Sequence, residues 1–304
     1  MNRQPYHDPK RVALAILSNQ VARISPSLYF RLIGETGRGF GAETPRTVAH
    51  YFMQSFYDYF KVLGISDTEI PSFLNGKHLL EYGPGNCPGV ALLMVAHGAK
   101  TVTCVDRFGL SRPDGTQAKI MSELVDMLDG APRGRAEKCF CVHGNPASGL
   151  SEKRINYIVT KNGLSCLHDC CDLAYSRAVL EHVNDLDATF QDMSRALRPN
   201  GLAIHKVDLK SHGLHRSNPL DFLVWPEWLW SLMYSGKGVP NRLRINHYRQ
   251  ALKTGGFGVD LLQVVERAKS SDIDEVRPHL ARPFKGLTTE DLECLAFWLV
   301  LKKH

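Results

Sequence analysis

The chain has 304 residues, 43% of them hydrophobic and 22% charged, and its formal net charge is +6. This composition allows a sizeable hydrophobic core and excludes a chain that is disordered throughout. The mildly basic balance is compatible with an anionic ligand but is too weak by itself to indicate nucleic-acid binding.

The sequence predicts neither a membrane span nor a signal peptide. No stretch reaches about 18 consecutive apolar residues, and the opening residues MNRQPYHDPK lack the apolar centre of a signal peptide. We therefore expect a cytoplasmic protein. Residues 12–24 (VALAILSNQVARI) predict an amphipathic helix that packs on the rest of the chain, with contact to a membrane surface as the lesser alternative.

The first part of the chain is predicted to be helical. Residues 47–64 (TVAHYFMQSFYDYFKVLG) carry aromatic side chains at 51, 52, 56, 57, 59 and 60, close to one face of a helix. A stripe of this kind is typical of core packing. We expect an N-terminal helical region over residues 1–75 and a second domain over residues 76–304.

From residue 77 onward, short strands and helices alternate. This alternation predicts an α/β fold, a doubly wound and mainly parallel seven-stranded sheet of Rossmann-like type with helices on both faces. An irregular, tryptophan-rich insertion is expected at about 208–240. The expected strands are 77–83, 100–109, 154–160, 171–179, 202–209, 259–266 and 294–303, and the expected helices are 89–99, 123–130, 186–201 and 241–257.

A glycine-containing loop, in the stretch LLEYGPGNCPG, follows the first predicted strand. Ligands of such sheets bind at the carboxyl ends of the strands. Gly83 and Gly85 would let the backbone approach a ligand, and the next helix would offer unpaired N–H groups to it. A dinucleotide site would read G-x-G-x-x-G, but the third glycine position holds Pro88.

Two acidic residues indicate what the loop binds instead. Glu81, two residues before Gly83, would repel a pyrophosphate but suits a cation such as S-adenosylmethionine, which carries a sulfonium and an ammonium group. Asp106 ends the second predicted strand, where a carboxylate can accept hydrogen bonds from both ribose hydroxyls. Together, in this order, these residues favour S-adenosylmethionine. A tight turn without a ligand is the alternative.

The sequence resembles the class I S-adenosylmethionine-dependent methyltransferases. LLEYGPG and VTCVDRF resemble their first motif and the acidic strand end that follows it. Residues 171–209 resemble their fourth strand, a helix start reading LEHV, a helix ending in R-x-L-x-P-x-G, and their fifth strand. Later segments are similar as well, so the resemblance covers roughly residues 75–304. One departure is Cys87, where many relatives carry a third glycine, which indicates an altered loop.

The resemblance implies roles for individual residues. Glu81 would partner the methionine amino group, Gly83 and Gly85 would line the methionine and ribose, and Asp106 would bind the ribose. Residues 162–164 would lie near the adenine, although no acid stands there. Arg107 and Phe108 would edge the adenine, and Ser176 and Arg177 would face the methionine end. The predicted cofactor-binding residues are Glu81, Tyr82, Gly83, Gly85, Asn86, Asp106, Arg107, Ser176 and Arg177.

Methyl transfer to a hydroxyl needs a base that removes the proton. His182, in LEHV, is the first candidate, and a capping or packing histidine is the alternative. Glu181 more naturally orients the loop or caps the helix. Asp208 and His212 follow the fifth strand, as does His215, and are further candidates, with solvated loop residues as the alternative. Some relatives bind a divalent metal through E-x-x-E-H, but Ala178 replaces the first glutamate here, so no metal is predicted.

Other groups of residues allow two interpretations each. Trp225, Trp228, Trp230 and Tyr234 could wall an acceptor pocket or form a packed lid. Arg242, Arg244 and His247 could hold an anionic acceptor, with a solvated helix face as the alternative. Cys139, Cys141 and His143 would share one face of a strand, and CLHDCC contributes further cysteines, yet the spacings fit reduced core thiols better than a zinc site.

The sequence therefore predicts a methyltransferase that uses S-adenosyl-L-methionine and acts on a small molecule. A hydroxyl oxygen of a sugar or glycolipid headgroup is the expected acceptor. One alternative is a regulatory protein that binds the cofactor without catalysis. Another is an RNA or protein methyltransferase, which SRAV (176–179) disfavours because amino-methylating enzymes carry N-P-P-[YF] there. The oligomeric state is not predicted.

Overall fold

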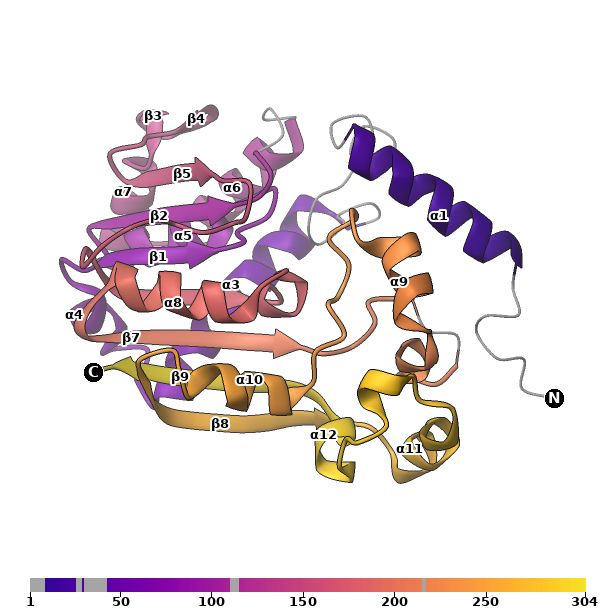
Figure 1. Ribbon diagram of the computed structural model, residues 1–304. Coiled ribbons are helices and arrows are strands. Elements are labelled where there is room, and N and C mark those ends of the chain that lie inside the picture. Colours follow the sequence, from indigo (N-terminus) through magenta and orange to yellow (C-terminus); the bar gives the residue numbers. More distant parts are fainter. Residues whose placement is uncertain (1–8, 26–28, 30–42, 110–114, 215–216) are drawn as a thin grey trace.

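A seven-stranded sheet forms the centre of the computed structural model (Figure 1), which describes residues 9–25, 29, 43–109, 115–214 and 217–304. The strand order is β5-β2-β1-β6-β7-β9-β8, and every pairing is parallel except those of β9 with its two neighbours. The strands are β1 (His78–Tyr82), β2 (Thr101–Asp106), β5 (Ile155–Val159), β6 (Cys171–Arg177), β7 (Leu197–Asp208), β8 (Phe257–Arg267) and β9 (Cys294–Lys303). The predicted mainly parallel, seven-stranded α/β sheet is confirmed.

The winding direction reverses at β1. The chain passes from β1 outward to β2 and β5, then returns to pair β6 with the other side of β1. Leu80, for example, lies opposite Thr103 of β2 and Ala174 of β6. The carboxyl ends of β1 and β6 therefore flank a topological switch point, where open α/β sheets bind their ligands.

Helices cover both faces of the sheet and bury two separate cores (Figure 1). One face packs against α3, α5, α6 and α7, and the other against α8 and α10. A small hairpin of β3 (Phe140–Val142) and β4 (Asn145–Leu150) stands apart from the main sheet. The helices named here are α3 (Pro45–Leu63), α5 (Gly89–Ala96), α6 (Gly115–Asp126), α7 (Gly130–Glu137), α8 (Leu186–Ala196) and α10 (Ile245–Leu252).

The aromatic helix α3 is a full part of the first core. It begins after Thr44, whose side chain accepts a hydrogen bond from the Thr47 N–H, and ends at Gly64 in the left-handed region. Its buried Phe52 lies on the first turn of α5, so close that a Cβ at Gly89 would stand 2.5 Å from the ring. The expected N-terminal helical region thus includes α1 (Pro9–Ile24), α3 and α4 (Ile70–Leu74), while residues 1–8, 26–28 and 30–42 lie outside the described part.

The insertion after β7 is more ordered than the sequence predicts. It contains η3 (Asp221–Val224) and α9 (Glu227–Tyr234), which form a third core with α1 and with the segment between β8 and β9. Trp225, Trp230 and Tyr234 are buried there, and Trp228 is 66% exposed. The three buried residues therefore pack in this core, Trp228 does not, and none of the four is among the residues that line the cavity described below. The segment between β8 and β9 holds α11 (Ser270–Val276), η4 (Arg277–His279), η5 (Arg282–Phe284) and α12 (Thr289–Glu293).

Two arginines of the chain before α10 are buried, so both sequence interpretations of them are wrong. Arg244 is fully buried and donates hydrogen bonds to the carbonyl oxygens of Leu209 (2.8 Å), Leu292 (3.1 Å) and Cys294. Arg242 donates to the Trp225 carbonyl at 2.7 Å. A guanidinium has five donors, and here they satisfy carbonyls where the chain leaves the sheet. The two arginines therefore fasten the insertion to the sheet.

The cysteines do not form a metal site in the described part of the chain. The eight cysteines are all free, and those of the two cysteine–histidine stretches do not gather into a group of metal ligands among the described residues. Cys139 precedes β3 and is buried whereas Cys141 is exposed, so the predicted shared strand face is wrong.

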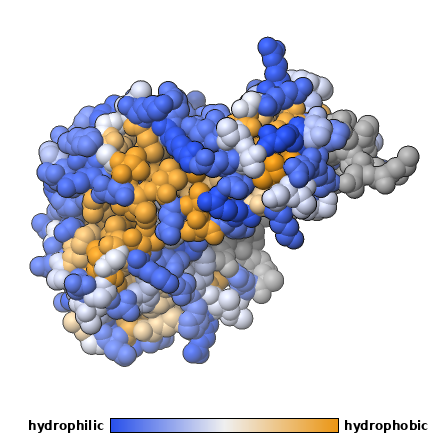
Figure 2. All heavy atoms as spheres, turned by 90° about the horizontal axis from the view of Figure 1, so that it is seen from below, coloured by the Kyte–Doolittle hydropathy of each residue, from blue (hydrophilic) through white to orange (hydrophobic). Residues whose placement is uncertain are grey.

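The side of the molecule with the sheet edge β8 carries a broad apolar area (Figure 2). No described helix has the length and apolar character needed to cross a membrane.

Candidate active site

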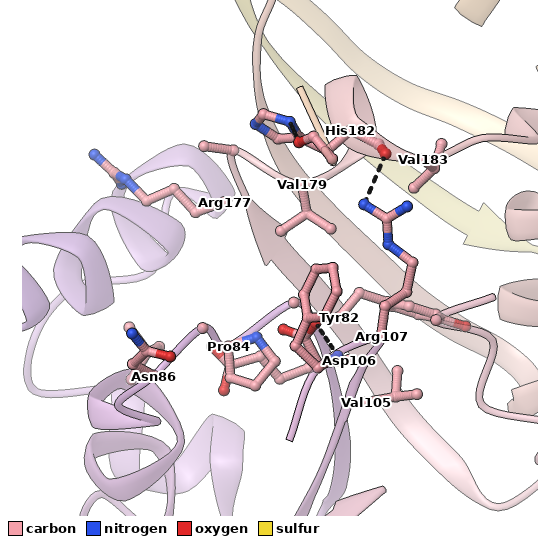
Figure 3. A pocket seen from close by; sticks show the side chains of 18 of the residues that line it. Tyr82, Pro84, Asn86, Val105, Asp106, Arg107, Arg177, Val179, His182 and Val183 are labelled. Atoms are coloured by element: carbon pink, nitrogen blue, oxygen red, sulfur yellow. Dashed lines mark hydrogen bonds between the residues drawn. The ribbon is translucent and has the colours of Figure 1, made fainter. Parts of the chain in front are cut away.

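A cavity of about 580 Å³ lies at the carboxyl ends of β1, β2 and β6, beside the switch point (Figure 3). Its volume is within the usual range for small-ligand sites. The loops after these three strands form its floor. Residues of the helix α3 also line it, as do Lys237 and Gly238 at the end of the insertion.

The glycine loop after β1 takes the shape the sequence predicts. Gly83 and Gly85 both have positive φ, +62° and +67°, and both line the cavity. A Cβ at Gly83 would stand 2.5 Å from Val179 Cγ2, so this position has no room for a side chain. A Cβ at Gly85 would meet nothing within 4 Å, because it would point into open space. The loop thus leaves room for a ligand to approach its backbone.

Glu81 is a buried carboxyl group beside this loop. It lines the cavity, and its Oε2 accepts hydrogen bonds from the Tyr175 hydroxyl (3.2 Å) and the Cys104 thiol (3.6 Å). Burial raises the pKa of Glu81 to about 8. A group held neutral in this way becomes charged when a cation binds next to it. Tyr82, the next residue, also lines the cavity, and its hydroxyl donates to Asp192 at 2.7 Å.

Asp106 ends β2 and faces the same cavity. Its Oδ1 accepts a hydrogen bond from the Phe108 N–H at 3.1 Å, which fixes the carboxylate in a tight turn. Burial raises the pKa of Asp106, and the nearby backbone N–H groups partly offset that effect. Arg107 lines the cavity too, and its guanidinium reaches the carbonyl oxygen of His182 at 3.3 Å (Figure 3). Asn86, Phe108, Asn162 and Gly163 are further lining residues.

The end of β6 corrects one prediction. Arg177 lines the cavity and pairs with Asp58 of α3 at 2.8 Å. Ser176 does not line it. Ser176 is 1% exposed, and its hydroxyl is 2.7 Å from His205 Nδ1, toward α8. Successive residues of a strand point to opposite faces, and here Ser176 points to the face that α8 covers. Ala178, next in the chain, has a positive φ of 54°, a strained conformation of a kind that gathers at functional sites.

Two histidines stand side by side at the cavity. The rings of His182 and His212 are 4.9 Å apart, and both residues line it. His182 belongs to the short helix η2 (Leu180–His182), and its Nδ1 is 2.7 Å from the carbonyl oxygen of Gly238, so we assign the proton to Nδ1 and the lone pair to Nε2. Burial lowers the pKa of His182 to about 4 and also lowers the pKa of His212, which favours the neutral form of both rings.

Asp208, the remaining catalytic candidate, does not line the cavity but lies behind His212. Its Oδ2 is 3.8 Å from His212 Nε2, and its Oδ1 accepts a hydrogen bond from the Lys210 N–H at 3.0 Å. His215 lies outside the described residues.

The structure adds residues that the sequence analysis missed. Tyr51, Ser55 and Tyr59 of α3 line the cavity at a spacing of four residues, on the aromatic stripe predicted to serve the core. The aromatic stripe alone could not show which residues line the cavity, because the same helix face both packs in the core and lines the cavity. Glu181 neither caps a helix nor bonds the loop. It is 1% exposed, and neither of its carboxylate oxygens has a hydrogen-bond partner in the described part of the chain.

These residues fit S-adenosyl-L-methionine. The fit rests on a buried carboxyl facing the cavity at Glu81, a cradle at Gly85 that a Cβ would fill, and a carboxylate at the end of β2. The comparison with protein families agrees. The family model described as "Methyltransferase domain" matches residues 53–262. The chain belongs to this family, and it is a methyltransferase that depends on S-adenosyl-L-methionine.

Solved structures resemble the chain at low identity. An S-adenosylmethionine-dependent methyltransferase from Mesorhizobium loti is 16% identical, covers 76% of this chain and 92% of its own, and has a TM-score of 0.44. One from Methanosarcina mazei is 15% identical, with 75% and 93% covered and a TM-score of 0.45. The 4+2 cyclase SpnF is 14% identical, with 94% of each chain covered and a TM-score of 0.42. None of the curated protein sequences matches. The family assignment therefore rests on the family model.

Proposed function

We propose that the protein transfers a methyl group to a hydroxyl oxygen of a small molecule, of sugar or glycolipid type. The observation that carries this proposal is the pair of histidines, His182 and His212, side by side at the cavity, where burial favours the neutral form of both rings. A neutral imidazole with a free lone pair can accept the proton that a hydroxyl loses as it attacks. Amino-group acceptors would not need such a pair so strongly, since a neutral amine already carries its lone pair.

The cofactor-binding roles are proposed residue by residue. Glu81 would hold the ammonium group, Gly83 and Gly85 would lie along the methionine and ribose, and Asp106 would bind the ribose hydroxyls. Tyr82, Asn86, Arg107 and Arg177 would complete the walls, since all of them line the cavity. Ser176 is not among the proposed contacts, because its hydroxyl is bonded on the other face of the sheet. When bound, S-adenosyl-L-methionine supplies a methyl group already activated by the sulfonium.

His182 is the proposed base. Because Nδ1 is bonded to the Gly238 carbonyl, Nε2 holds the lone pair that would take the proton. His212, in contact with the same ring, would hold the acceptor hydroxyl, and Asp208 would orient His212 through Nε2. The insertion and α3 close the cavity on two sides, which would exclude water from the transfer.

Other polar groups of the cavity support the proposed acceptor class. Ser55 is buried, and its hydroxyl has no partner among the described residues although it lines the cavity. Tyr51 and Arg177 lie beside it, with the guanidinium 5.6 Å from the ring centre of Tyr51. An aromatic ring, a buried hydroxyl and a guanidinium together suit a polyhydroxylated acceptor, because sugars offer both apolar C–H faces and many hydroxyls.

A transfer assay tests this function. Protein is incubated with S-adenosyl-L-methionine carrying a labelled methyl group and with panels of sugars, glycolipids, amines, peptides and RNA. We expect labelled methyl ethers on a hydroxylated acceptor, and at least about a hundredfold lower turnover in His182→Ala with unchanged cofactor affinity. Label on nitrogen or on RNA would overturn the proposal. Cofactor binding without transfer to any acceptor would favour the regulatory alternative.

A further inference from the structure

Three metal-ligating side chains converge next to the cavity. Glu181, His182 and His212 each offer one ligand atom, and these atoms all lie within 4.8 Å of one another. They form the one such group among the described residues. We propose that they bind a divalent metal ion. The role of this ion in catalysis rests on the function proposed above, whereas the binding itself does not.

Glu181 is the strongest sign of a missing partner. Its side chain is 1% exposed, and within the described ranges both oxygens lack a hydrogen-bond partner. The basic group that the structure places beside it, His212 Nε2, is 3.7 Å away. Leaving a buried carboxyl without a donor costs free energy, because the group has lost its water and gained no partner. Natural structures tolerate such groups where an ion or water completes them. A cation at this point would satisfy both oxygens.

The backbone around Glu181 is held in place without using its side chain. The Asn241 N–H donates to the Glu181 carbonyl oxygen at 2.6 Å, and the Asn241 amide donates to the carbonyl oxygens of Leu180 (3.1 Å) and Val183 (3.0 Å). The carboxylate is thus fixed in its buried position by bonds to its neighbours. A ligand presented by a rigid turn loses little entropy when it binds a metal.

The two histidines are set up as ligands. His182 donates Nδ1–H to the Gly238 carbonyl, which is the usual outer contact of a histidine that binds metal through its other nitrogen. His212 Nε2 lies between two carboxylates, 3.7 Å from Glu181 Oε1 and 3.8 Å from Asp208 Oδ2. Asp208 would therefore balance the charge of the ion from the outer side.

The donor set indicates the class of metal. Two imidazoles and one carboxylate suit zinc, manganese, iron or cobalt better than calcium, which takes oxygen ligands only. Ligands on a tetrahedral ion with bonds of about 2.1 Å are roughly 3.4 Å apart, so side-chain rotation would draw the three groups slightly closer. Both histidines line the cavity, so open coordination positions would face it. There an ion would lower the pKa of an acceptor hydroxyl. With the ion bound, His182 Nε2 is a ligand and cannot be the base, so the lowered pKa of the hydroxyl takes the place of the base proposed above.

Metal titration tests the proposal without any activity assay. Metal-stripped protein is titrated with zinc and with manganese by calorimetry, and with cobalt by its visible absorption. The variants are Glu181→Gln and His212→Ala, with His168→Ala as the matched control because His168 is a histidine of the CLHDCC stretch, away from the cavity. We expect one ion per chain, affinity at least about tenfold lower in the first two variants, and unchanged affinity in the control.

Several outcomes would overturn the site. One is a dissociation constant no lower than about 1 mM, and another is equal metal affinity in the wild type and all three variants. The third is a loss of affinity in His168→Ala alone, which would place the metal at the cysteine stretch. Binding of S-adenosyl-L-methionine checks that each variant is folded, and His212→Ala, at a partly exposed position, keeps the test valid if Glu181→Gln is unstable. A protein that methylates hydroxyls but binds no ion would refute the metal and leave the proposed base in place.

Discussion

The carboxylate of Asp106 offers the sharpest test of the cofactor site. It accepts a hydrogen bond from the Phe108 N–H at 3.1 Å and faces the cavity, where it would accept hydrogen bonds from both ribose hydroxyls. A hydrogen bond to a charged group contributes about 1.5–3 kcal/mol. Water replaces part of this in a variant, so we expect Asp106→Ala to lose about 2–4 kcal/mol of binding free energy, roughly a 30- to 1,000-fold rise in Kd.

The chain contains a matched control for this substitution. Asp208 also ends a strand, and its Oδ1 accepts a hydrogen bond from the N–H two residues later, at 3.0 Å, in the same kind of turn. Asp208 does not line the cavity. Calorimetric titration of S-adenosyl-L-methionine into Asp106→Ala, Asp106→Asn and Asp208→Asn separates the effects. We expect about a 5- to 30-fold loss in Asp106→Asn, which keeps one acceptor oxygen, and a change within about twofold in Asp208→Asn.

Equal affinity of wild type and Asp106→Ala would refute the ribose assignment. An equal loss in Asp208→Asn would show that the turn, and not the ribose contact, determines affinity. Thermal unfolding without cofactor provides the control for folding. We expect Asp106→Ala to change the unfolding free energy by less than about 1 kcal/mol, because the burial cost of the carboxylate offsets its interactions with the nearby backbone N–H groups.

Three further predictions concern other parts of the molecule. Because burial raises the pKa of Glu81 to about 8, affinity for the cationic cofactor should rise by up to about tenfold per pH unit from pH 6 to 7.5, as the carboxyl loses its proton. Calorimetry should find no such pH dependence in Glu81→Gln. An affinity of the wild type that does not change with pH would contradict this role of Glu81. Gly83→Ala should unfold at a lower urea concentration than Gly85→Ala, with a free energy of unfolding about 1–3 kcal/mol smaller, because both positions have positive φ but only the first lacks space for a side chain. Gly85→Ala should instead weaken cofactor binding. Similar stabilities of the two variants would count against the described loop. Arg244→Met should lower the free energy of unfolding in urea by about 3–5 kcal/mol, because it leaves buried carbonyls without their donor. Arg249→Met, at an exposed ion pair, should lower it by under about 1 kcal/mol. Equal losses in the two variants would mean that Arg244 does not anchor the insertion.

Local chemistry explains which site features could be predicted from the sequence. A glycine loop directly after a strand, an acid two residues earlier and an aspartate at the next strand end are close in the chain, and parallel strands bring their carboxyl ends to one edge of the sheet. The amino-acid order therefore suffices to place Glu81, Gly85 and Asp106 together, and all of them line the cavity. For Ser176 the sequence offers only proximity to the strand end, and strand alternation turns this residue to the other face.

The amino-acid order by itself determined the alternation of strands and helices, and with it the sheet and the cofactor loop. Only tertiary structure decided that Tyr51 and Ser55 of α3 form a cavity wall, that Arg244 is buried as an anchor, and that His212 meets Glu181. These contacts join segments far apart in the chain. Periodicity reports which face of an element is apolar, but the partner of that face depends on how all the elements pack together.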